Sequence, residues 1–200
     1  MILPRPRWGL AGLSVLMATA SCGADETRES ADTETVFDPR ILAENAREAG
    51  PADGSFTRAG ADETVRIELP GAPLARPGPG PATATLVVTA DGETRARTEL
   101  GGAGYLIAGT VDMEGDGVDE IIVFGSDMQQ GVETGWATIV ALEDGVFRPV
   151  ERFDRVWQDS CTRGGETAMR RGKTIHLDRS SPEPGFRTEG FSEACPDAAG

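Results

Sequence analysis

The residues with the clearest chemical potential form a short acidic stretch in the middle of the chain. Residues 112–120 read D-M-E-G-D-G-V-D-E, so five of nine side chains are carboxylates. Carboxylates stand at loop positions 1, 3, 5 and 9. Gly117 stands at position 6, where a calcium loop turns sharply and glycine has the lowest conformational cost. This spacing predicts a cation site made of oxygen ligands.

The charge of the stretch supports the same prediction. Carboxylates this close together destabilise an ordered conformation unless a cation neutralises them. Between Arg97 and Arg148 the sequence has no lysine or arginine, and calcium fits better than magnesium because it accepts about six to eight oxygen ligands. A solvated acidic turn without an ion is the alternative. The expected ligands are Asp112, Glu114, Asp116, Glu120 and, through its main-chain carbonyl, Val118.

The surroundings of the loop do not match an EF-hand. That motif needs a glutamate at position 12 and a helix on each side, but position 12 is Val123, and the run 121–124 favours a strand. Residues 105–125, Y-L-I-A-G-T-V-D-M-E-G-D-G-V-D-E-I-I-V-F-G, resemble the FG-GAP or VCBS repeats of integrin-like β-propellers. Residues 136–145 follow the pattern more loosely. The resemblance implies a strand–loop–strand unit with calcium on the same five ligands, although Glu114 replaces the usual Asp or Asn.

The elements that would position this loop are short strands. Apolar and β-branched runs predict strands at 65–69, 84–89, 95–100, 105–108, 121–124, 137–142, 147–150, 174–177 and 186–191. Asp91-Gly92 and Asp144-Gly145 predict hairpin turns, Arg171-Gly172 predicts another turn, and 76–81 predicts a loop. We therefore expect an all-β, mainly antiparallel domain over 61–197, either blade-like or a sandwich. A complete propeller would need more strands than this chain offers.

The N-terminus has the features of an export signal. Within residues 1–21, two arginines precede an apolar core at 10–17 that is too short to span a membrane. The sequence T-A-S-C that ends at Cys22 resembles a bacterial lipobox, which implies cleavage before Cys22 and a lipid anchor on it. Thr19 departs from the preferred leucine, so ordinary cleavage, giving a secreted or periplasmic protein, is the alternative. Either outcome places the chain in or beyond the bacterial cell envelope.

The segment that follows the signal looks like a tether. From Gly23 to Thr35 the chain has no aromatic or large apolar residue, so it cannot bury enough surface to offset its ordering entropy. We assign 22–60 to a flexible, disordered tether that contains a short helix at 40–49. Asp38 would be the N-cap of that helix, and Pro39 would take its first position.

The cysteine count predicts one disulfide. The chain has three cysteines, and an odd number in an exported protein requires a separate role for one of them. If Cys22 carries lipid, Cys161 and Cys195 remain as a pair in an oxidising compartment. A bridge across that separation would stabilise the fold by roughly 3 to 4 kcal/mol. Two free thiols are the alternative.

Net charge and motifs narrow the function classes. A formal charge of −14 disfavours nucleic acid and anionic lipid headgroups as ligands. His176 is the only histidine, and the sequence lacks a G-x-S-x-G elbow, a zinc spacing and a phosphate loop, so an enzyme is the less favoured class. Trp136 and Trp157 form either a carbohydrate-stacking platform or, more commonly for strand aromatics, core.

Together these patterns predict an envelope-anchored lipoprotein with a calcium-stabilised β module. The membrane would be contacted through lipid on Cys22, and the module would serve a binding or scaffold role toward a protein or glycan that the sequence does not identify. An envelope hydrolase with paired carboxylates and a metal-free structural lipoprotein are the alternatives.

Overall fold

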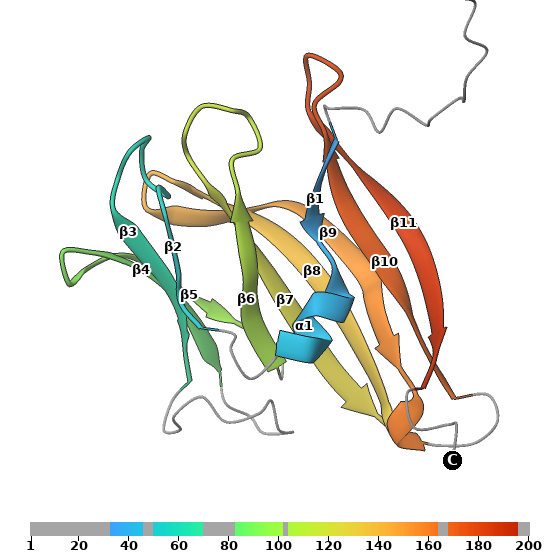
Figure 1. Cartoon of the computed structure of the whole chain (residues 1–200). Coiled ribbons are helices and arrows are strands. Elements are labelled where there is room, and N and C mark those ends of the chain that lie inside the picture. The colour runs from blue at the N-terminus through green and yellow to red at the C-terminus, as the bar shows by residue number, and fades with distance from the viewer. Residues whose placement is uncertain (1–32, 46–49, 70–82, 102–103, 164–167, 196–200) are drawn as a thin grey trace, which may run out of the picture.

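The computed structural model describes residues 33–45, 50–69, 83–101, 104–163 and 168–195 (Figure 1). The predicted signal 1–21, the lipidation site Cys22 and the predicted loop 76–81 lie outside the described residues. The strands are β1 (Thr33–Phe37), β2 (Ala52–Gly54), β3 (Glu63–Glu68), β4 (Ala84–Ala90), β5 (Glu93–Leu100), β6 (Gly104–Val111), β7 (Glu120–Gln129), β8 (Val132–Glu143), β9 (Val146–Asp159), β10 (Met169–Asp178) and β11 (Gly185–Ala194). The helices are α1 (Pro39–Asn45) and the 3₁₀ turn η1 (Cys161–Arg163).

The strands form two antiparallel sheets. The first sheet has the order β1-β10-β9-β8-β7-β6, with β11 paired to the other edge of β10, and the second sheet has the order β2-β3-β4-β5. The first sheet curls until β1 lies beside β6, and the second sheet lies against its outside (Figure 1). The predicted all-β antiparallel class is therefore confirmed, in the form of a curled sheet with a second sheet packed on it.

The two sheets enclose two apolar clusters. The inner core fills the curl of the first sheet and includes Phe37, Ile122, Phe124, Ile139, Trp157, Ile175 and Leu177. The outer core lies between the two sheets and includes Phe56, Val65, Leu86, Val88, Ile121, Val123 and Leu142. Successive side chains of a strand point to opposite faces, so the run 121–124 of β7 contributes alternately to the two cores. A strand buried on both faces needs this uninterrupted apolar sequence.

Three hairpins close with left-handed turn residues. Asp91, Gln130 and Asp144 have φ angles of 52°, 51° and 51°, and each precedes a glycine with φ of 77°. These values belong to the two-residue turns whose twist matches that of paired strands. The two Asp-Gly predictions are confirmed, whereas the turn at Gln130-Gly131 was not expected from the sequence.

The predicted turn at Arg171-Gly172 is wrong. Both residues lie inside β10, where Gly172 pairs with Trp157 of β9 on one side and Phe191 of β11 on the other. Glycine is required there for space rather than for a turn. A Cβ on Gly172 would lie 2.3 Å from the carbonyl oxygen of Val156.

The N-terminal boundary of the domain also differs from the prediction. β1, α1 and β2 all lie within 33–54, inside the predicted tether, and β1 joins the first sheet by pairing with β10. Asp38 caps α1 as expected, because its Oδ1 accepts the N–H of Arg40 at 3.0 Å. The Arg40 side-chain hydrogen bond lowers the pKa of Asp38. Of the predicted helix 40–49, residues 46–49 lie outside the described residues.

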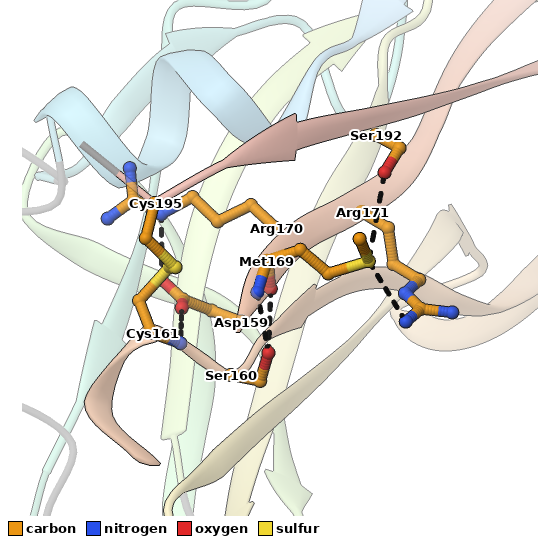
Figure 2. Close-up of a disulfide and its surroundings, with 8 residues drawn as sticks. All are labelled: Asp159, Ser160, Cys161, Met169, Arg170, Arg171, Ser192 and Cys195. Atoms are coloured by element: carbon orange, nitrogen blue, oxygen red, sulfur yellow. Dashed lines mark hydrogen bonds and ion pairs between the residues drawn. A yellow bond between two sulfur atoms is a disulfide. The ribbon is translucent and has the colours of Figure 1, made fainter. Parts of the chain in front are cut away.

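The predicted disulfide is present. Cys161 in η1 and Cys195 after β11 are joined, with their Cα atoms 5.6 Å apart (Figure 2). Asp159 supports the bridge, because its Oδ1 accepts the N–H of Cys161 at 2.7 Å and its Oδ2 accepts Nε of Arg170 at 2.9 Å. The bond therefore ties the ends of β9 and β11 across β10. Within the described parts of the chain, neither helix has the length and hydrophobicity that a membrane span requires.

The packing at Gly172 gives a test of this fold. Gly172→Ala would force a methyl group against a main-chain oxygen, and overpacking of this kind costs about 1 to 3 kcal/mol. We expect the free energy of unfolding, measured by urea denaturation, to fall by that amount. Gly185→Ala is the matched control, since a Cβ on Gly185 would meet no atom within 4 Å and its effect should stay within about 0.5 kcal/mol. Equal stability of the two variants would contradict the β9–β10 contact.

Candidate metal loop

The acidic stretch forms the connection between β6 and β7. The two strands pair up to Val111 and Glu120, so the loop between them is closed at its base by the ladder. Ile121 and Ile122, directly after the loop, are completely buried. The predicted strand–loop–strand arrangement is therefore present, and the base of the loop is fixed by a strand whose first half is buried.

Asp112 organises the interior of the loop. Its Oδ1 accepts the N–H groups of Gly115 at 2.7 Å and of Asp116 at 3.1 Å, and its Oδ2 accepts the N–H of Gly117 at 2.9 Å. Gly115 and Gly117 have φ angles of 75° and 81°, in the left-handed region that glycine adopts most readily. The sharp turn expected at Gly117 is confirmed, and the chain winds around the first carboxylate.

Glu120 closes the other end of the loop. Its Oε2 accepts the N–H of Met113 at 2.8 Å, across the base of the turn. Burial raises the pKa of the Glu120 carboxyl, and the neighbouring carboxylates of Asp112 and Asp116 raise it further, while the Met113 hydrogen bond opposes the increase. Three of the predicted ligand residues are thus close enough to repel one another.

Asp119 has a structural role that the sequence did not indicate. Its Oδ2 accepts the N–H of Ser55 at 2.8 Å, and its own N–H donates to the carbonyl of Ser55 at 2.8 Å. Gly54 allows this approach, because a Cβ there would lie 2.9 Å from Oδ2 of Asp119. Asp119 thus attaches the loop to the segment that follows β2. Glu63 holds that segment in place, because it is 3% exposed and its carboxylate accepts the N–H groups of Phe56 and Thr57.

A protein cation also reaches the loop. The Arg179 guanidinium donates to the carbonyl oxygen of Asp112 at 2.6 Å and to Oε2 of Glu34 at 2.7 Å. The absence of basic residues between Arg97 and Arg148 therefore does not mean that no basic side chain is near. Arg179 directly follows β10, and β10 pairs with β1, which lies beside β6 in the curl, so the fold brings Arg179 next to the loop.

The expected ligands differ in how far they fit a metal. Carboxylate and carbonyl oxygens are the donors that calcium prefers. Glu114 and Asp116 are exposed, however, and Asp116 Oδ1 accepts the N–H of Val118 at 2.9 Å. Among the described residues, no three histidine, cysteine or acidic side chains converge as a metal site would require. The donor chemistry fits calcium, but the side chains as placed do not form a complete coordination shell.

The other side chains considered from the sequence lie elsewhere. Trp157 is 4% exposed in the inner core, whereas Trp136 is on the outer face of the first sheet. His176 lies in β10 with Nδ1 3.0 Å from Oγ1 of Thr35 and Nε2 3.7 Å from Glu189. These two tryptophans do not form one platform, and His176 sits where neighbouring strands pair.

Comparison with known proteins adds no family. The chain matches no family model, no curated protein and no solved structure. The resemblance of residues 105–125 to FG-GAP or VCBS repeats therefore stays a prediction that rests on those residues alone.

The role of Asp112 can be tested without a metal. Asp112→Ala removes the acceptor of three N–H groups, and we expect it to lower the free energy of unfolding by about 1 to 3 kcal/mol. Hydrogen exchange measured by NMR should accelerate at the amides of Gly115 and Gly117. Glu114→Ala, which removes an exposed carboxylate of the same loop, is the control and should change neither quantity in metal-free buffer. Unchanged exchange in Asp112→Ala would rule out this organisation of the loop.

Proposed function

We propose that this chain is an exported, lipid-anchored β module whose β6–β7 loop binds calcium, and that the module serves a binding or scaffold role at the bacterial cell envelope. The fold suits such a role, because paired strands hold the loops in fixed positions. The proposal joins two parts: a calcium-stabilised loop at 112–120, and an anchor at Cys22.

The observation that carries the calcium part is the winding of the loop around Asp112. Three N–H groups turn toward this carboxylate through left-handed Gly115 and Gly117, while the loop ends are fixed by β6 and β7. The loop brings Asp112 and Asp116 near enough to Glu120 to repel its charged form, although the side chains do not converge on one point in the structure. Calcium would neutralise their mutual repulsion and would be held by the carboxylates of Asp112, Glu114, Asp116 and Glu120 and by the main-chain carbonyl of Val118.

Calcium binding is expected to raise the thermal stability of the folded chain. A ligand that binds only the native state stabilises it by about 2.7 kcal/mol at one hundred times its dissociation constant. Melting followed by circular dichroism, in calcium and in EGTA, measures the shift. The double variant Glu114→Gln and Asp116→Asn should lose this shift, because it removes two of the proposed ligand charges. Its metal-free stability should change little, since both side chains are exposed.

A matched variant separates ligation from general charge. Glu99→Gln with Glu151→Gln removes two exposed carboxylates from other strands and should keep the calcium response. Identical melting midpoints of the native chain in calcium and in EGTA would remove calcium from the proposal. The metal-free structural lipoprotein would then be the better description.

The anchor rests on the residues that precede the described domain. Incorporation of a radiolabelled fatty acid into the full chain expressed in bacteria, compared with Cys22→Ser, tests it. We expect label on the native chain, none on the variant, and fractionation of the native chain with membranes. Equal labelling of both would remove the lipid anchor and leave a secreted or periplasmic module.

A further inference from the structure

An open depression of about 530 Å³ lies where β8, β9 and β10 meet. Its lining consists of Thr134, Gly135, Trp136, Asp154, Arg155 and Lys173. A Cβ on Gly135 would touch Phe124 and Trp157 of the inner core, so Trp136 points to the opposite face. The depression is therefore on the outer face of the first sheet, and none of its lining residues belongs to the acidic loop.

A β-bulge shapes the depression. Gly135 pairs with Trp157 and Ala137 with Phe153, so β9 advances four residues while β8 advances two. Arg155, within the bulge, has a φ angle of 54°. The other non-glycine residues with positive φ in the described parts of the chain occupy hairpin turns, whereas Arg155 lies inside a strand. Bulges redirect side chains, and strained backbone conformations outside turns cluster at binding and active sites.

The depression holds positive charge on an acidic protein. Arg155 and Lys173 line the depression, and within the described residues neither forms an ion pair. Lys173 is the only lysine of a chain with formal charge −14. Arg152, beside them, pairs with Asp154 at 2.9 Å and lies 5.3 Å over the Trp136 ring. The lining thus holds two cations that have no ion pair among the described residues, with the Asp154 carboxylate in the same depression.

The rest of the lining is aromatic and polar. Trp136 is fixed in place, because its indole occupies the space over Gly125 and its ring meets Tyr105 edge to face at 6.1 Å. Thr134 adds a hydroxyl, and Asp154 adds a hydrogen-bond acceptor. The indole lies between Gly125 and the Arg152 guanidinium, so it is a side wall of the depression and not a stacking platform. The Thr134 hydroxyl and the Asp154 carboxylate suit a ligand that carries hydroxyl groups, and the two cations without an ion pair suit an acid group on that ligand.

We infer that this depression binds an acidic saccharide, with the carboxylate of a uronic acid unit held between Arg155 and Lys173. Thr134 and Asp154 bind sugar hydroxyls, and the sugar ring lies beside the indole of Trp136. A singly charged carboxylate is favoured over a phosphate group, because Asp154 in the lining and the acidic surface of the chain oppose a doubly charged ligand. The inference gives a ligand class to the binding role proposed above, but it depends on neither calcium nor the anchor.

The test uses the full chain and isothermal titration calorimetry with three probes: an oligoglucuronate, a neutral oligoglucose of equal length and inorganic phosphate. We expect the oligoglucuronate to bind at least about tenfold more tightly than either of the others. Lys173→Gln and Arg155→Gly should each weaken it by about 10- to 100-fold. Arg148→Gln, an exposed arginine of the same strand that pairs with Glu143, should leave the affinity unchanged.

Stability separates loss of the site from loss of the fold. Glycine adopts the left-handed conformation freely, so Arg155→Gly should keep or raise the melting midpoint while it loses the ligand. Asp144→Gly, which makes the same change in a hairpin turn, should keep both stability and affinity. Equal affinity for the neutral oligosaccharide, tighter binding of phosphate, or no binding of any probe would overturn the inference.

Repeating the titration in EGTA distinguishes this proposal from the calcium proposal. If the saccharide binds in EGTA and calcium has no effect on melting, the calcium proposal is rejected and the saccharide proposal stands. If calcium raises the melting midpoint and no saccharide binds, the saccharide proposal is rejected and the calcium proposal stands.

Discussion

The burial of β7 on both faces is the constraint on which the rest of the architecture depends. Ile122 and Phe124 point into the inner core, Ile121 and Val123 point into the outer core, and none of the four is more than 7% exposed. Full burial of side chains of this size contributes about 1.5 to 3 kcal/mol each. Such a strand is stable only as the middle layer, so the first sheet must curl over one face while the second sheet covers the other.

The same strand gives the acidic loop its fixed base. The loop begins and ends on residues paired in the β6–β7 ladder, and its interior is held by main-chain N–H groups directed at Asp112. Asp119 attaches the loop to the connection between β2 and β3, through Ser55. Arg179, directly after β10, donates to the carbonyl of Asp112. Part of the negative charge is balanced by these N–H groups and one guanidinium. Because of these contacts, the loop has a defined shape before any ion is bound. The carboxylates of Glu114 and Asp116 remain exposed on it.

The two candidate binding features lie where the strand ladder is interrupted. Regular pairing satisfies the main-chain groups and points side chains alternately to two faces, which leaves little freedom to gather several of them at one place. The β6–β7 loop gathers carboxylates by winding around one residue. The β9 bulge inserts two extra residues opposite β8 and places Arg155 in the same depression as Lys173 of β10. The disulfide between Cys161 and Cys195 holds the ends of β9 and β11 beyond that bulge.

Local patterns in the sequence determined most of the strands, the two Asp-Gly turns, the turn at Gly117 and the disulfide pair. Each of these depends on side-chain alternation, on the φ preference of a few neighbouring residues or on the parity of the cysteines. The tertiary structure alone decided that β1 joins the sheet, that Arg171-Gly172 lies inside β10, that Arg179 reaches Asp112 and that Arg155 occupies a bulge. These features arise from pairings between distant segments and from the curl of a sheet around its core, which no short stretch of sequence encodes.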